Sequence, residues 1–504
     1  MSVRRHITET IASSWLCLVV TSVAQLLMVP VALSALSKPD FALFAIISQV
    51  VTVIMLAEMG ARSAASRLLV DGLAEGKSSY NKIWTAMILI FACQALVMLL
   101  LVLLMIPLLG VFFKFDESQL TMAKQIFFAV GVIRAGGYIF SVFPTALFAG
   151  QKLKDVNLLS LFGTGVQLAS FCLAIWKGMG LWAYPISVLA AQVVITVLLI
   201  RKTKQAGLFG KVGRETIDLN RIKTLFFLGV DVFISSIFGV IMGSSLLLLS
   251  GHLLTLEETA ILAVNLKLVT LMTHLLQRIP GSATPMLMKM QSEKKEHQFY
   301  VWWKLLTKVT VFAAILCGGG FVLWNKVIVT QWASSELILD PLSIILLSLI
   351  PFRYLFHNQF VGSLTIFKEI RKVNLWLMWE IVLYFGLALY LGSRFGMHGL
   401  LAANLCSLAG GASIGGIKWM AVYIKVSGGE LAALAGKIAI PLTIAFSVLV
   451  IFLNYFSWEG FFGAVLLSSI WVVFAGLIAY TLVFDARERA RMTELWESRS
   501  FLRR

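Results

Sequence analysis

Three cationic residues stand inside stretches of sequence that are otherwise apolar enough to cross a bilayer. Arg134 lies in FFAVGVIRAGGYIF (127–140), Arg353 lies in IPFRYLFHNQF (350–360), and Lys267 lies in a third apolar stretch. A charge at this depth costs several kcal/mol even on lenient scales, so such residues usually serve a function. A guanidinium also binds phosphate through two parallel hydrogen bonds. The three cations therefore predict contact with an anionic group, and phosphate suits them best.

Other polar side chains follow these cations at helical spacing, four or seven residues further along the same helix face. Polar stripes of this kind on apolar helices predict a water-filled interior cavity. The predicted lining residues are Arg134, Arg353, Lys267, Tyr138, His274, His357, Asn358, Gln359 and Asn265. Cations outnumber carboxylates there, so we expect the cavity to be net positive.

Two carboxylates, Glu58 and Asp231, also lie within or at the end of apolar stretches. They are candidates for coupling transport to an ion. They are equally candidates for a purely structural ion pair with Arg134, and the sequence leaves both interpretations open. A third carboxylate, Glu380, lies near Trp376 and Trp379, and we interpret it as a feature of the membrane interface.

The sequence predicts no metal site and no cofactor. The five cysteines all fall inside apolar stretches at no ligand spacing, and the six histidines form no paired metal-binding motif. Coupling to H⁺ or Na⁺ stays open.

The composition indicates a membrane protein. The chain has 504 residues and is 59% hydrophobic, against roughly 45–50% in ordinary globular chains. The net charge of +17 resides mainly in the segments between apolar stretches, and alternate segments carry most of it. This is the pattern of the positive-inside rule rather than of a nucleic-acid-binding face. It predicts that both termini lie in the cytoplasm.

Hydropathy and length predict ~14 membrane spans, each of about 20 residues or more. They cover approximately 11–36, 41–57, 83–107, 125–148, 156–176, 180–200, 224–250, 259–278, 305–324, 341–366, 373–392, 398–424, 435–455 and 461–484.

The two halves of the chain resemble each other. LKDVNLLSL at Leu153 matches IRKVNLWLM at Ile370, and Arg134 matches Arg353, at an offset of about 220 residues. The fold class predicted is therefore an all-α polytopic membrane protein with two six-helix repeat lobes and two appended helices. The predicted divisions are 1–223 for the first lobe, 224–430 for the second, and 431–504 for spans 13 and 14 with a basic tail.

Two segments resemble the MATE-like flippases of the MOP superfamily: FALFAIISQVVTVIMLAEMGARSAASRLLVDGLAEGKSSYNK (41–82) and ALFAGQKLKDVNLLSLFG (146–163). Within that superfamily the chain looks most like the Wzx-type polysaccharide-export flippases. The resemblance implies a transporter in the bacterial inner membrane that moves a polyprenyl-diphosphate-linked oligosaccharide by alternating access. It also implies that Arg134, Lys267 and Arg353 meet the diphosphate or acidic sugars. On this hypothesis the sugar hydroxyls would contact Tyr138, Asn265, Asn358 and Gln359. The partners implied are this glycolipid, membrane lipid and the polysaccharide polymerase or export machinery, and not nucleic acid.

Three alternative functions compete with this interpretation. A cation-coupled drug exporter of the same fold needs a net anionic cavity, which is the opposite of the charge predicted. A lipid II flippase typically places arginines on its first span, and 11–36 contains none. A membrane enzyme such as a polymerase or ligase needs a sizeable outer loop, which the chain lacks. We therefore expect a transporter rather than an enzyme.

Overall fold

The computed structural model describes residues 3–58, 60–367, 371–410, 412–455, 461–485 and 489. These ranges are almost entirely helical and contain no strand. By contacts the chain divides into two compact units, Met1–Ala263 and Val264–Arg504.

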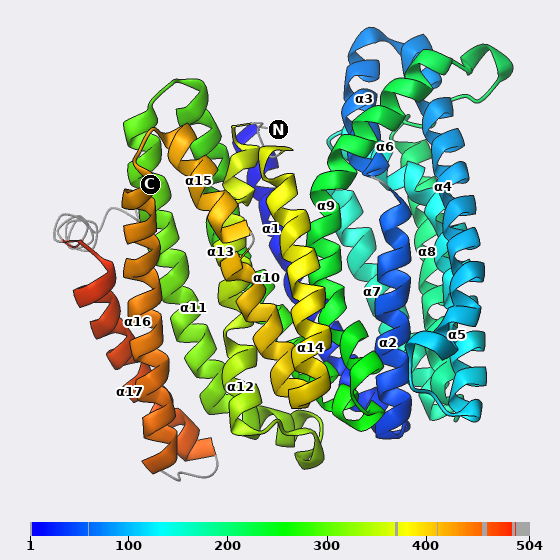
Figure 1. Ribbon diagram of the computed structural model, residues 1–504. Coiled ribbons are helices and arrows are strands. Elements are labelled where there is room, and N and C mark those ends of the chain that lie inside the picture. Colours follow the sequence, from blue (N-terminus) through cyan, green and yellow to red (C-terminus); the bar gives the residue numbers. More distant parts are fainter. Residues whose placement is uncertain are drawn as a thin grey trace. The chain divides into compact units, whose positions relative to one another are not determined.

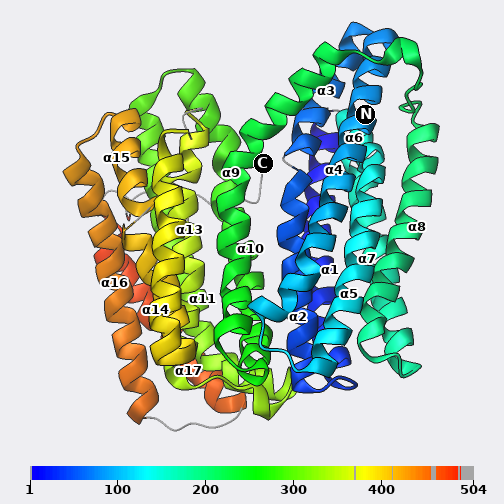
Figure 2. The same cartoon turned by 45° about the vertical axis from the view of Figure 1, so that its right-hand side comes forward.

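The first unit contains nine helices and the start of a tenth within the described ranges, and Figures 1 and 2 show them from two directions. They are α1 (Val3–Leu33), α2 (Lys38–Ile54), α3 (Ala61–Glu75), α4 (Lys77–Phe112), α5 (Glu117–Tyr138), α6 (Val142–Ala149), α7 (Leu153–Trp176), α8 (Ala183–Gln205), α9 (Leu219–Leu253) and the first residues of α10 (Leu256–Ser292).

The second unit holds the rest of α10 and the remaining helices. They are α11 (Glu296–Trp332), α12 (Pro341–Ser348), α13 (Ile350–Phe360), α14 (Arg371–Gly410), α15 (Ala412–Ile424), α16 (Gly428–Tyr455) and α17 (Phe461–Ile478). Short 3₁₀ segments follow several helices, among them η1 (Met55–Glu58), η2 (Ile139–Ser141) and η6 (Gly362–Thr365).

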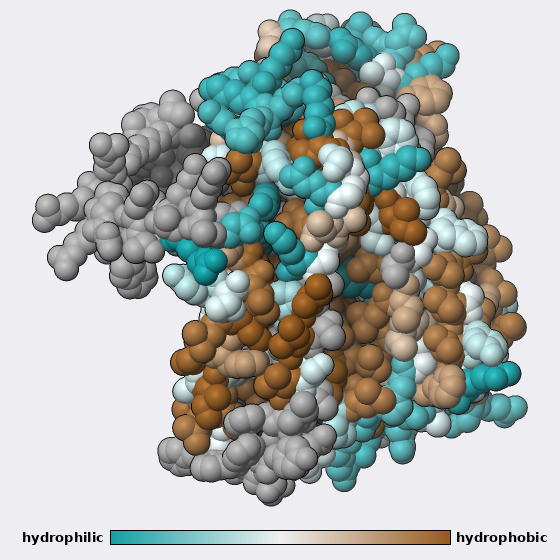
Figure 3. Space-filling model, turned by 60° about the vertical axis from the view of Figure 1, so that its left-hand side comes forward, coloured by the Kyte–Doolittle hydropathy of each residue, from teal (hydrophilic) through white to brown (hydrophobic). Residues whose placement is uncertain are grey.

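The all-α membrane fold is confirmed. Each of the predicted spans coincides with one or two helices, and eleven stretches of the described chain are long and apolar enough to cross a membrane. One of the eleven, Asn374–Ile424, contains two predicted spans, because α14 changes direction at Gly396. The backbone there has φ 57° and ψ −133°, which glycine adopts far more readily than other residues. On the face seen in Figure 3, hydrophobic side chains cover the middle of the helices and hydrophilic side chains gather at their ends.

Local sequence signals start the helices at these positions. Asp116 caps α5, accepting a hydrogen bond from the backbone N–H of Gln119 at 2.8 Å, while the Gln119 side chain accepts from the backbone N–H of Asp116 at 3.1 Å. This capping box satisfies two N–H groups that a helix start otherwise leaves without partners. Asp340 caps α12 in a similar position, directly before Pro341.

The segment between α8 and α9 contacts α4, and the first turn of α9 contacts α3. The Tyr80 hydroxyl donates to the carbonyl of Leu208 at 2.6 Å, and Arg221 binds Glu75 at 2.7 Å. The α9 helix then packs against α2, α3 and α4. The division by contact therefore falls after Ala263, whereas the division by repeat, after residue 223, stays a prediction.

In the second unit, α16 and α17 pack against α11 (Figure 1). A Cβ atom at Gly319 of α11 would lie within 2.0 Å of the Trp471 ring of α17, so this close approach requires glycine. Beyond α17, Asp485 accepts hydrogen bonds from Lys304 at 2.7 Å and from Lys308 at 3.1 Å. The Lys308 side chain is fully buried, whereas Asp485 is 42% exposed.

We predict that Asp485→Asn destabilises the second unit by about 1–3 kcal/mol, because the buried Lys308 ammonium loses its carboxylate partner. The loss stays moderate because Asp485 itself is only half-buried, so water already screens part of the interaction. Hydrogen bonds, first from Lys304 and then from Lys308, lower the pKa of Asp485 from 3.8 to about 2. The stabilisation should therefore be complete above about pH 4 and disappear as the pH falls toward 2. Thermal unfolding of the purified protein in detergent, measured across this pH range, tests both points.

The control is Asp155→Asn, which removes an exposed pair with Lys202 at 3.7 Å and should cost only about 0–1 kcal/mol. Equal effects of the two substitutions at neutral pH would contradict the role given to Asp485.

Candidate functional site

Arg134 lies on α5, one turn before the helix ends. Its side chain is half-buried and lies against the hydroxyl of Tyr184 on α8, close enough to interact with it. The Tyr184 ring in turn meets the Phe44 ring of α2 edge-on, with centroids 4.8 Å apart. None of the ion pairs among the described residues involves Arg134. No carboxylate among the described residues therefore balances its positive charge, and a tyrosine hydroxyl lies beside it.

Tyr138 belongs to a polar network that joins the end of α2 to the end of α5. The Tyr138 hydroxyl donates to Gln94 Oε1 at 3.1 Å, and Gln94 Nε2 donates to the carbonyl of Glu58 at 2.8 Å. Tyr138 is only 2% exposed. In this conformation its hydroxyl is used inside the first unit, so contact with a sugar stays a prediction that needs the network to open.

Glu58 pairs with Arg62 rather than with Arg134. Arg62 lies 3.3 Å from the Glu58 carboxylate, donates to Ser141 Oγ at 3.3 Å, and sits 5.9 Å from the centre of the Tyr138 ring. Arg62 is not among the residues that the sequence predicts to line the cavity. The four-residue spacing of Glu58 and Arg62 was the available signal. Glu58, one of the two carboxylates that could form a structural ion pair with Arg134, is thus paired with Arg62 instead.

Arg353, the counterpart of Arg134 in the repeat, has a different environment. It lies on α13, is 1% exposed, and forms an ion pair with Glu380 of α14, which is 0% exposed. Its Nη2 atom also lies 3.5 Å from Ser407 Oγ. The interpretation of Glu380 as an interface feature is therefore wrong. The neighbouring tryptophans suggested an exposed position, but the side chain points into the unit, where it neutralises a buried guanidinium.

The two arginines are therefore alike in sequence position but differ in the partner beside them. Glu380 cancels the charge of Arg353, whereas Tyr184 leaves the charge of Arg134 in place. Burying a charged pair without good hydrogen bonds is costly, and removing one partner of such a pair costs more still. In this conformation Arg353 joins α13 to α14 through its ion pair with Glu380. Arg134 is therefore the better candidate to bind an anion. Contact between Arg353 and the substrate stays a prediction.

On α10, Lys267 is half-buried and His274 is exposed two turns later. Leu276 of the same helix packs with Ala314 of α11 and Leu355 of α13, which places α10 in the second unit's core from this point onward. Lys267 takes part in none of the ion pairs among the described residues. No carboxylate among the described residues therefore pairs with it.

Two of the predicted lining residues use their side-chain amides in hydrogen bonds within the second unit. Asn265 is fully buried, donates to the carbonyl of Leu337 at 3.0 Å and accepts from Asn325 at 2.7 Å. Gln359 is 5% exposed and donates to Thr307 Oγ1 at 2.9 Å. These contacts hold helices together and leave neither amide a free surface for a sugar in this conformation.

The other predicted lining residues remain candidates. His357 lies one turn after Arg353 on α13 and is half-buried, as is Asn358. The backbone of Asp231 is helical in α9, but its side chain lies outside those that the structure describes. Among the described residues, no group of three or more histidine, cysteine or acidic side chains gathers to hold a metal ion.

We predict that Glu380→Gln destabilises the protein by about 3–5 kcal/mol, because it leaves the Arg353 charge buried without its carboxylate. The double variant Arg353→Met with Glu380→Leu should recover most of this loss, since it removes both charges and keeps apolar volume. Thermal unfolding in detergent measures both effects. A single variant as stable as wild type would show that the pair is not a structural element.

Comparison with known proteins agrees with this fold. The model of the polysaccharide biosynthesis protein family matches residues 7–291. No curated protein sequence matches the chain significantly.

Three solved structures share its helical architecture. The chain is similar to the lipid II flippase MurJ in an inward closed conformation, with 14% identity, a TM-score of 0.65, and 94% of this chain and 97% of that chain covered. It is similar to an inward-facing multidrug resistance MATE family transporter of the MOP superfamily, with 13% identity, a TM-score of 0.63, and coverage of 81% and 96%. An outward-facing transporter of that description matches with 13% identity, a TM-score of 0.60, and coverage of 83% and 95%.

Proposed function

Because the chain belongs to the polysaccharide biosynthesis protein family, we propose that it is a flippase for a lipid-linked oligosaccharide used in cell-surface polysaccharide synthesis. The cargo would be an oligosaccharide joined to a polyprenyl carrier through diphosphate. The helical membrane fold is that of transporters, and family membership supports transport rather than catalysis.

The observation that carries the proposal is the charge left on Arg134. A diphosphate brings at least two negative charges, and a guanidinium can bind two of its oxygens at once. In the low dielectric of a membrane-embedded site this attraction is stronger than in water. Tyr184, lying beside Arg134, adds a hydroxyl that can donate to the same phosphate without cancelling the arginine charge. A drug exporter for cationic compounds would be expected to place a carboxylate here instead.

Lys267 and His274 are the proposed contacts from the second unit, where both retain some exposure. Alternating access is proposed from the fold, since structures of inward-facing and outward-facing transporters both match the chain. Glu58 and Asp231 are the carboxylates available to couple the movement to H⁺ or Na⁺.

The setting proposed is the bacterial inner membrane, with both termini in the cytoplasm and polysaccharide polymerase or export proteins as partners. The bias of lysine and arginine toward alternate loops supports this orientation.

We predict that Arg134→Gln lowers transport about tenfold or more, because a charge-assisted hydrogen bond to phosphate contributes about 1.5–3 kcal/mol. Arg134→Lys should lose less, since it keeps the charge but not the two-point geometry. The assay complements a deletion strain of the source bacterium and quantifies surface polysaccharide and lipid-linked precursor in the inner membrane. Loss of surface glycan with accumulation of precursor is the expected result.

The matched control is Arg67→Gln, which removes an exposed arginine of α3 in the same unit and should leave transport unchanged. All variants must reach equal levels in the membrane. Wild-type transport by both Arg134 variants would refute the role of this residue. A deletion that leaves surface glycan intact would refute the cargo, and accumulation of lipid II or increased drug sensitivity would then identify one of the alternatives.

A further inference from the structure

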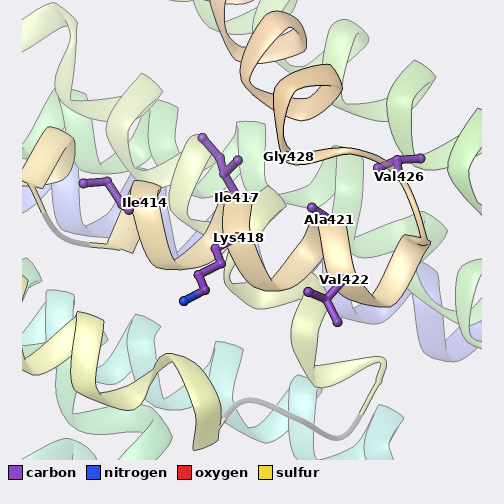
Figure 4. A pocket seen from close by; sticks show the side chains of 7 residues that line it. All are labelled: Ile414, Ile417, Lys418, Ala421, Val422, Val426 and Gly428. Carbon is purple, nitrogen blue, oxygen red and sulfur yellow. The ribbon is translucent and has the colours of Figure 1, made fainter.

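A second candidate site lies in the second unit, where α15 turns into α16. An open cleft of about 540 Å³ is lined by Ile414, Ile417, Lys418, Ala421, Val422, Val426 and Gly428. This volume is within the usual range for ligand-binding clefts, roughly 300–1,000 Å³. Figure 4 shows the side chains of α15 along the cleft, with the Lys418 nitrogen reaching away from the helix backbone.

The shape of the cleft follows from the way α15 ends. Lys425 adopts a left-handed conformation with φ 60°, and the N–H of Val426 donates to the carbonyl of Ala421 at 3.1 Å. This is the hydrogen bond of a Schellman motif, which brings the residue after the turn back over the last helical turn. Val426 and Ala421 accordingly form one wall together.

Contacts from α11 hold this turn in place. Glu296 binds Lys425 at 2.8 Å, and the Tyr300 hydroxyl donates to Glu430 at 2.8 Å. One contact links α11 to the turn, and the other links α11 to the first turn of α16.

The lining combines a hydrocarbon surface with a single cation. Ile414 and Val422 are 49% and 56% exposed, and with Lys418 they follow one face of α15 at a spacing of four residues. The interaction described for the Lys418 ammonium is with the ring of its neighbour Trp419, 5.7 Å away. Lys418 lies six residues before Ile424, the last residue of the helix, so its side chain can reach toward the membrane surface.

We propose that this cleft binds one anionic phospholipid of the bilayer, with an acyl chain along Ile414, Ala421 and Val422 and the phosphate on Lys418. The wall is as apolar as the bilayer interior, so an acyl chain can pack against it by van der Waals contact without meeting water. A lysine near the membrane surface attracts one anionic headgroup. The cleft suits a phospholipid better than the glycan cargo, because its described lining offers one cation and no side-chain hydroxyl or amide for a sugar.

Native mass spectrometry of the purified full-length protein tests this site, after incubation with phosphatidylglycerol or phosphatidylcholine as probes. Wild type should retain phosphatidylglycerol in preference to phosphatidylcholine. Lys418→Ala should lower phosphatidylglycerol retention about fivefold, the factor expected for one lysine near the membrane surface. Lys418→Arg should restore it, and Val422→Trp should reduce retention of both lipids by filling the cleft.

The matched control is Lys437→Ala, which removes an exposed lysine of α16 outside the cleft and should leave retention at the wild-type level. Unchanged retention of phosphatidylglycerol by both Lys418→Ala and Val422→Trp would overturn the proposal. So would a loss confined to undecaprenyl diphosphate in a parallel incubation, because the cleft would then belong to the cargo. The experiment measures lipid binding, so its result does not depend on whether the protein transports the proposed cargo.

Discussion

A charged side chain in a membrane-spanning helix needs a counter-charge, a hydrogen-bonding neighbour or water, and the arrangement of this protein follows from how each charge meets that need. In the second unit Arg353 is buried against Glu380, and Lys308 is buried against Asp485. The first pair joins two helices that follow each other along the chain, and the second joins segments 177 residues apart. They tie α13 to α14 and α11 to the end of the α17 segment, so the charges serve the packing of the bundle.

In the first unit the charged side chains have partners of a different kind. Glu58 and Arg62 pair with each other at the end of α2, and Arg134 is left beside a neutral tyrosine. An arginine in that state is costly in the absence of an anion, and this cost is a reason for an anion to bind. The two arginines that the predicted repeat aligns thus have different surroundings: Arg353 pairs with a buried carboxylate, and Arg134 lies beside a tyrosine.

The same principle accounts for the two candidate ligand sites. Arg134 lies within a predicted membrane span. Its guanidinium has parallel N–H donors, which favours a phosphate group that can accept two hydrogen bonds at once. Lys418 lies near a helix end on a hydrocarbon surface, which favours a single headgroup with its chain in lipid. The proposed function would use both kinds of site, because the proposed cargo and the surrounding bilayer each combine lipid with phosphate.

The sequence by itself determined the all-helical membrane class, the positions of the spans and the repeat that aligns Arg134 with Arg353. Those features are local, since hydropathy and length along the chain decide whether a segment can cross a bilayer. Only the tertiary structure decided the partners of the charged residues: Glu380 pairs with Arg353, and Arg62 pairs with Glu58. It also decided that Asn265 and Gln359 form buried hydrogen bonds and that α9 packs against helices of the first unit. Hydropathy places a residue at a depth in the membrane, but it does not give the rotation of each helix about its axis. That rotation, together with the choice of neighbouring helix, decides which polar groups meet.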